Sequence, residues 1–135
     1  MASTVYPLTK QALLSGTAID LTTANIKAIL IDTGAYTYSA THDFLNDVAA
    51  GSRIATSANL ASKTVANGVF DAADVTFSAV SGASVEAILV YIDTGVESTS
   101  RLLAYIDDTG GGDTTVTPNG GNIDITWNAS GIFSL

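Results

Sequence analysis

Apolar runs separated by short polar segments are the clearest pattern in this chain. Residues 25–32 contain one such run, interrupted inside only by Lys27, and residues 85–93 and 101–107 contain two more. A run that is apolar on both faces is typical of a strand covered on both sides. Apolar and polar residues alternate elsewhere, which predicts strands with one buried face. These alternating segments are 53–60, 75–78 and 122–127, and in the last of them Ile123, Ile125 and Trp127 are expected to face inward.

Turn signals lie between these runs. Asn67-Gly68 divides residues 63–70 and predicts a hairpin. The two strongest runs, 85–93 and 101–107, are expected to pair as an antiparallel hairpin with a longer loop. A second Gly-containing turn at 119–121 is expected to join 114–117 to 122–127. The chain ends in the apolar residues 132–135, and this end is expected to be tied into a sheet or an interface.

Two segments in the N-terminal half favour short helices. The first covers residues 4–15, where Thr4 is the expected cap, Pro7 falls in the first turn and Gly16 follows the last. The second covers residues 41–50. The pattern as a whole predicts a mainly β protein, a β-sandwich or jelly-roll-like fold with one or two short helices in the N-terminal half, built as a single domain over residues 1–135.

The amino-acid composition excludes several classes of function. Of the 135 residues, 47% are apolar and 13% are charged, and the net charge is −8. The five basic residues are scattered, so nucleic-acid binding is not expected. The chain has no cysteine and no apolar run of membrane-spanning length, and we expect neither thiolate chemistry nor a membrane contact. A surface of small uncharged polar residues suits packing against another protein.

One motif points toward catalysis. Asp-Thr-Gly, the triplet of aspartic proteases, follows an apolar run at Asp32 and at Asp93, and a looser copy begins at Asp107. A dimeric aspartic protease is therefore a remote alternative, but the chain is far too short for a two-lobed enzyme. We interpret the triplets as strand-ending turns, because Asp favours strand ends and Gly supplies the turn. Asp107, Asp108 and Asp113 lack the spacing of an EF-hand loop, so a calcium ion held by them is a weak alternative. We expect no catalytic, metal-binding or cofactor-binding residues and no enzyme activity.

Nearly the whole chain carries a family likeness. The matching stretches are 10–16, 25–33, 53–57, 63–65, 68–78, 86–88, 103–107, 116–121 and Trp127. Through them the chain resembles small structural proteins of tailed-phage virions, which look like head decoration or cement proteins, with some relatives in the tail or neck. The Gly-rich loop 110–113 departs from that pattern.

The resemblance implies a virion protein on the phage capsid surface, made in the host cytoplasm. Its expected partners are the major capsid protein, whose subunits it would bridge, and further copies of itself, for example as a trimer. A tail, neck or baseplate component is the alternative, and a carbohydrate-binding module is a weaker one. The expected contact residues are Val5, Tyr6, Leu8, Phe133 and Leu135, for which packing in the chain's own core is the competing interpretation.

Overall fold

The computed structural model describes residues 4–107 and 116–135, and these residues form a mainly β protein with one α-helix in the N-terminal half. Three short 3-10 helices, η1 to η3, interrupt the strands. The elements are β1 (Thr4–Val5), α1 (Pro7–Leu14), β2 (Ile26–Ile31), η1 (Leu45–Asp47), η2 (Ala50–Ser52), β3 (Arg53–Thr56), β4 (Thr64–Ala66), β5 (Val69–Asp71), β6 (Val75–Phe77), β7 (Ala87–Ile92), η3 (Glu97–Thr99), β8 (Leu102–Ile106), β9 (Ile123–Ile125) and β10 (Phe133–Ser134).

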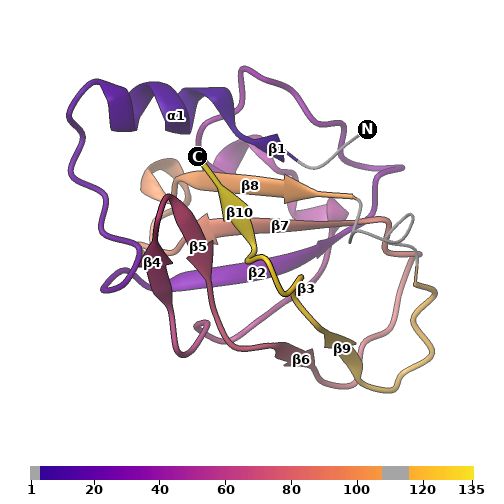
Figure 1. Cartoon of the computed structure of the whole chain (residues 1–135). Helices are drawn as coiled ribbons and strands as arrows, with labels where there is room; N and C mark the ends of the chain where they lie inside the picture. The colour runs from indigo at the N-terminus through magenta and orange to yellow at the C-terminus, as the bar shows by residue number, and fades with distance from the viewer. Residues whose placement is uncertain (1–3, 108–115) are drawn as a thin grey trace.

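A five-stranded antiparallel sheet in the order β1-β8-β7-β2-β3 forms the centre of the molecule (Figure 1). The strands β2, β7 and β8 are the three apolar runs of the sequence, and β2 pairs with β7 along its whole length, from Ile26 opposite Ile92 to Ile31 opposite Ala87. Nearly every residue in these strands is buried, because both faces of the sheet are covered. The predicted hairpin of β7 and β8 is confirmed.

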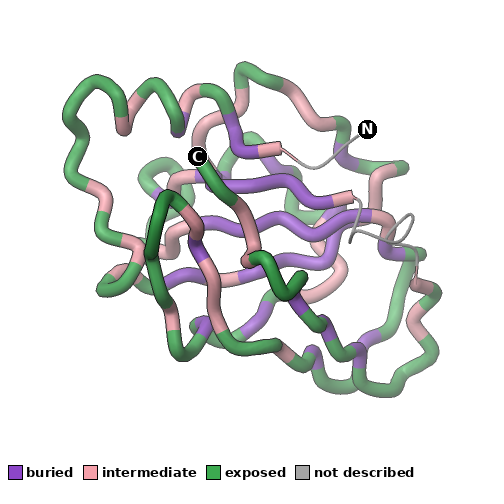
Figure 2. Tube along the Cα trace, in the orientation of Figure 1, coloured by how far each residue is buried: buried purple, intermediate pink, exposed green. Residues whose placement is uncertain are grey.

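A second layer covers one face of this sheet and completes a sandwich-like fold. It consists of the three-stranded sheet β10-β5-β4, which lies in front of the central strands in Figure 1, and the two-stranded sheet β6-β9, which is drawn below them. The core between the layers includes Phe70, Phe77 and Trp127. Ile123, Ile125 and Trp127 point inward, as the alternation predicts. Figure 2 shows the result: burial is concentrated along the central strands, and exposed residues dominate β4 and the loops.

The opposite face of the central sheet is covered by irregular chain. Residues 33–52 bring Tyr36, Leu45 and Val48 onto this face, where they pack with Tyr6 and Tyr105 in a second core. The predicted helix at 41–50 is wrong, because η1 and η2 occupy this region instead. Two backbone N–H groups, at Asp43 and Phe44, donate to the Asp47 carboxylate, and such local side-chain bonds compete with a helix.

Other boundaries differ from expectation in smaller ways. Helix α1 begins at Pro7 after Tyr6, so Thr4, which lies in β1, does not cap it. The Asn67-Gly68 hairpin is confirmed, with φ of +52° and +78° at the two turn residues. Strand β9 pairs with β6, and the segment 114–117, which the turn at 119–121 was expected to join to 122–127, is described only from Val116 onward. The apolar chain end is tied into a sheet, as β10 pairs with β5. No helix in the described parts of the chain is long and apolar enough to cross a membrane.

Candidate functional site

A groove runs between helix α1 and strand β10, and we call it the α1–β10 groove. It consists of two adjoining hollows that share Lys10 and Ser134 in their walls. The first hollow, of about 280 Å³, lies among β1, β8 and β10, and the second, of about 270 Å³, lies between the end of α1 and the last residue of the chain. The other lining residues are Thr4, Val5, Ala104, Ile106, Ile132 and Phe133 in the first hollow, and Leu13, Leu14 and Leu135 in the second.

One wall of the groove is fixed by the N-terminal segment. The Tyr6 N–H donates to the Leu103 carbonyl at 3.0 Å, and the buried Thr9 hydroxyl of α1 donates to the Leu102 carbonyl. These bonds attach the start of the helix to β8, the strand next to the edge strand β1. The short helix therefore has a packing partner, which a helix of eight residues needs in order to be stable.

The opposite wall is fixed by the second layer. The Ile132 N–H donates to the Phe70 carbonyl at 2.8 Å, and the Leu135 N–H donates to the Gly68 carbonyl at 2.9 Å. The ring of Phe133 packs on that of Phe70, with centroids 5.3 Å apart. Strand β10 thus lies on β5 with one backbone edge paired, and it is the outermost strand of its sheet.

The five expected contact residues separate into two groups. Val5, Phe133 and Leu135 line the groove. Leu135 is 64% exposed and Phe133 is half-buried, whereas Val5 is buried against the chain itself. Tyr6 is fully buried in the second core, and the half-buried Leu8 does not line the groove. For Tyr6 and Val5 the arrangement favours core packing.

Lys10 gives the groove its positive charge. It is the one basic side chain that has no partner among the residues described in the structure, and it is exposed. The other four are engaged within the chain: Lys27 pairs with Asp93 at 2.8 Å, Arg53 pairs with Glu97 at 2.7 Å, Lys63 donates to the Ala24 carbonyl, and Arg101 stacks over the Phe44 ring at 4.8 Å.

A polar chain that the sequence did not reveal crosses the second core. The hydroxyls of Tyr6 and Tyr36 lie 2.8 Å apart, and the Tyr36 hydroxyl lies 2.8 Å from Nδ1 of His42. No local sequence pattern links His42 to Tyr36, because both residues lie in an irregular segment. The rings of Tyr38 and Tyr105 pack beside these hydrogen-bonded side chains, with centroids 5.4 Å apart.

Burial strongly disfavours ionisation in this cluster. It raises the pKa of Tyr36 to about 12 and raises the pKa of Tyr6 further, with the hydrogen bond to Tyr36 acting in the same direction. Phenols held neutral in this way are poor nucleophiles and poor bases near neutral pH. The polar chain therefore fastens residues 36–42 onto the sheet and carries no sign of catalysis.

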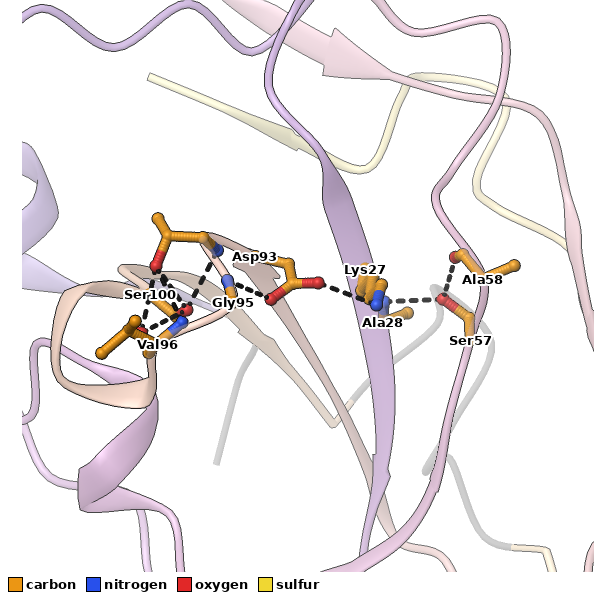
Figure 3. Close-up of polar contacts among 9 residues, drawn as sticks. Lys27, Ala28, Ser57, Ala58, Asp93, Gly95, Val96 and Ser100 are labelled. Atoms are coloured by element: carbon orange, nitrogen blue, oxygen red, sulfur yellow. Dashed lines mark hydrogen bonds and ion pairs between the residues drawn. The ribbon is translucent and has the colours of Figure 1, made fainter.

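The Asp-Thr-Gly triplets form turns. The Asp32 and Asp93 carboxylates each accept the N–H of the glycine two residues on, at 2.9 and 3.0 Å. Figure 3 shows the Asp93 turn, in which the other carboxylate oxygen meets Lys27. That ion pair lowers the pKa of Asp93. The threonines are engaged too, because Thr33 donates to Glu86 through its N–H and its hydroxyl.

The two triplets cannot form a proton-sharing pair within one chain. Asp32 follows β2 and Asp93 follows β7, and these strands are antiparallel over six residues. The carboxylates therefore lie at opposite ends of the sheet, roughly 20 Å apart at about 3.3 Å per residue. An aspartic-protease dyad requires two carboxylates in contact. The looser triplet follows β8, and its residues from Asp108 on lie outside the described part of the chain.

Neither a search for metal ligands nor comparison with known proteins identifies a further site. Among residues 4–107 and 116–135 no group of three His, Cys, Asp or Glu side chains is placed to hold a metal ion. Of the expected acidic trio, Asp108 and Asp113 fall outside those residues. Comparison of the chain with known protein families and with curated proteins finds no match.

Proposed function

We propose that this protein is a structural component of a phage virion that binds the outer surface of the capsid and stabilises it by bridging coat subunits. The observation that carries the proposal is the open α1–β10 groove, which is bordered by strand edges and is apolar at the end formed by Leu13, Leu14 and Leu135. It lies beside a central sheet whose two faces are covered by the chain's own residues. The low charge of the chain and its resemblance to small virion proteins support the same role.

The groove suits an extended segment of a partner. Strands β1 and β10 are the outermost strands of their sheets, so within the described part of the chain each leaves one backbone edge without a neighbouring strand. An extended peptide can add to such an edge through backbone hydrogen bonds, while pockets beside the edge select its side chains. The second hollow is apolar around Leu14 and Leu135, the first hollow, beside Phe133, also exposes polar surface, and Lys10 adds a positive charge. We therefore propose a coat segment that combines apolar side chains with an acidic residue.

The stabilisation follows from mass action. A ligand that binds the assembled shell better than free subunits shifts the equilibrium toward assembly, by about 2.7 kcal/mol per site when its concentration is about 100 times its Kd. A groove of this size makes each contact modest. Many copies on one shell, each touching two subunits, would add their effects.

Shells prepared with and without the protein test the proposal. Bound protein should co-sediment with purified shells in hundreds of copies and raise the temperature at which they disrupt. Copies in the range of a tail ring, such as six or twelve, would move the protein to the tail or neck. Failure to bind shells, or binding with no change in their thermal stability, would refute the cement role.

A matched pair of variants locates the contact. Ser134 lies at an exposed position of β10 and lines both hollows. Ser134→Trp places a large side chain in the groove and should abolish co-sedimentation with the shells. Ser130→Trp introduces the same side chain at an exposed loop position outside the groove and should leave binding intact. Equal binding by both variants would show that the groove is not the contact.

A further inference from the structure

The two Asn-Gly pairs of this chain differ in their surroundings. Asn67-Gly68 forms the tip of the β4–β5 hairpin, and Asn119-Gly120 lies in the loop before β9. Both asparagines and both glycines are exposed, and both glycines have positive φ. Local sequence and exposure are therefore matched, and any difference in their reactivity has to come from the fold.

Asn-Gly pairs are chemically reactive because a glycine leaves the next backbone nitrogen unhindered. That nitrogen attacks Cγ of the asparagine, the bond from Cγ to the side-chain nitrogen breaks, and ammonia leaves with the proton of the attacking N–H. The product is a five-membered cyclic imide. Water then adds to one of its two carbonyls and gives either aspartate or isoaspartate, in which the backbone runs through the side-chain carboxyl.

The fold restrains the second pair. The Gly120 N–H donates to the Val80 carbonyl at 2.8 Å, so the attacking nitrogen is engaged. The Asn119 side-chain oxygen accepts the Gly121 N–H at 2.9 Å, and the Val80 N–H donates to the Gly121 carbonyl at 2.9 Å. The ring cannot close at Asn119 until all three bonds open.

The fold leaves the first pair free to open. Among the described residues no hydrogen bond engages the Gly68 N–H or the Asn67 side chain. The pair lies at the tip of a hairpin whose first strand, β4, has all three of its residues exposed. Short exposed elements at a sheet edge open with the lowest free energies in a protein.

We infer that Asn67 is a site of spontaneous modification, at which the native protein converts asparagine to aspartate and isoaspartate while Asn119 is protected. The change reaches the α1–β10 groove, because the Gly68 carbonyl accepts the Leu135 N–H at 2.9 Å. An isoaspartate puts one more methylene into the backbone directly before Gly68 and displaces that carbonyl. The end of β10 then loses its attachment, while the Ile132 bond to Phe70 persists.

Incubation of the full chain at mildly alkaline pH, followed by peptide mapping with mass spectrometry, tests the inference. Deamidation at Asn67 should be at least roughly tenfold faster than at Asn119, which corresponds to about 1.4 kcal/mol in the free energy of opening. In denaturant the two sites should react at similar rates. Equal rates in the native protein, faster reaction at Asn119, or no reaction at Asn67 would each overturn it.

A variant distinguishes the effect of deamidation at Asn67 from other changes that occur during incubation. Asn67→Gly removes the reacting amide and preserves a turn that tolerates positive φ at both positions. In aged wild-type protein, hydrogen exchange should accelerate at the Leu135 N–H and remain slow at the Ile132 N–H, and aged Asn67→Gly protein should show neither change. Acceleration at Leu135 in that variant, or its absence in isoaspartate-containing wild-type protein, would contradict the proposed link to the groove.

Discussion

The Tyr6–Tyr36–His42 chain makes a quantitative prediction, because one hydroxyl is shared by two partners. Replacing Tyr36 by Phe removes both hydrogen bonds and leaves the hydroxyl of Tyr6, which is fully buried, without a partner. A lost bond costs about 1 kcal/mol and a buried orphaned hydroxyl costs about 1–3 kcal/mol more. We expect Tyr36→Phe to lower the free energy of unfolding by about 2–4 kcal/mol.

The companion variants should behave differently. Tyr6→Phe removes one bond and leaves Tyr36 bound to His42, so it should cost only about 0.5–1.5 kcal/mol. The double variant has no orphaned hydroxyl in the core, and it should be no less stable than Tyr36→Phe alone. Tyr38→Phe is the matched control, since the Tyr38 hydroxyl makes no hydrogen bond within the described residues, and it should change stability by less than about 0.5 kcal/mol.

Urea denaturation of the four variants measures these differences. The sum of the two single effects should exceed the double effect by about 2 kcal/mol, as expected for residues in one network. Additive effects, or a larger loss for Tyr6→Phe than for Tyr36→Phe, would refute the assignment of the Tyr36 hydroxyl as the shared group.

Three further predictions concern other parts of the fold. Burial raises the pKa of Tyr6 and that of Tyr36 in the folded state, so their contribution to stability is complete below the unfolded pKa near 10 and is lost as pH rises through the folded pKa values. Absorbance at alkaline pH should therefore show that these phenols ionise as the protein unfolds. Independent ionisation of all tyrosines in the folded protein would contradict this. The Arg53 guanidinium donates to the Leu45 and Val48 carbonyls and to the Glu97 carboxylate. Arg53→Lys should therefore lower the free energy of unfolding by about 1–2 kcal/mol in urea denaturation. An unchanged urea midpoint would show that the several donors of the guanidinium are not needed. Gly131 has a φ of +104° and an added Cβ would lie 2.3 Å from Val69, so Gly131→Ala should cost at least about 2 kcal/mol; a stable variant with protected β10 amides would refute that reasoning.

The sequence was informative where a single segment contained the whole signal. The apolar runs identified β2, β7 and β8, since burial on both faces leaves few polar positions in a strand. Asn67-Gly68 identified a hairpin because its turn type requires positive φ at both residues. In both cases the cause lies within about ten residues of chain.

The failures have a common physical origin in contacts between distant segments. The partner of β9 could not be read from the sequence, because Val75 and Ile125 join strands about fifty residues apart. The apolar spacing at 44–48 looked helical, although these side chains are positioned by the sheet below and by the Arg53 side chain, which binds the freed carbonyls. The Tyr6–Tyr36 contact likewise depends on tertiary structure, as no local pattern links the two residues.

The arrangement of the layers restricts where a partner can be met. Both faces of the central sheet are covered by this chain, so adhesion through either face of that sheet would require uncovering a core. What remains accessible of the central sheet is its strand edges and the hollows beside them. Among these edges β10 stands out, because the groove beside it combines exposed Leu14 and Leu135 with the charge of Lys10, which has no partner within residues 4–107 and 116–135. That combination is the physical reason for placing the proposed coat contact there, and it makes the state of the Asn67-Gly68 turn, which anchors the end of β10, relevant to binding.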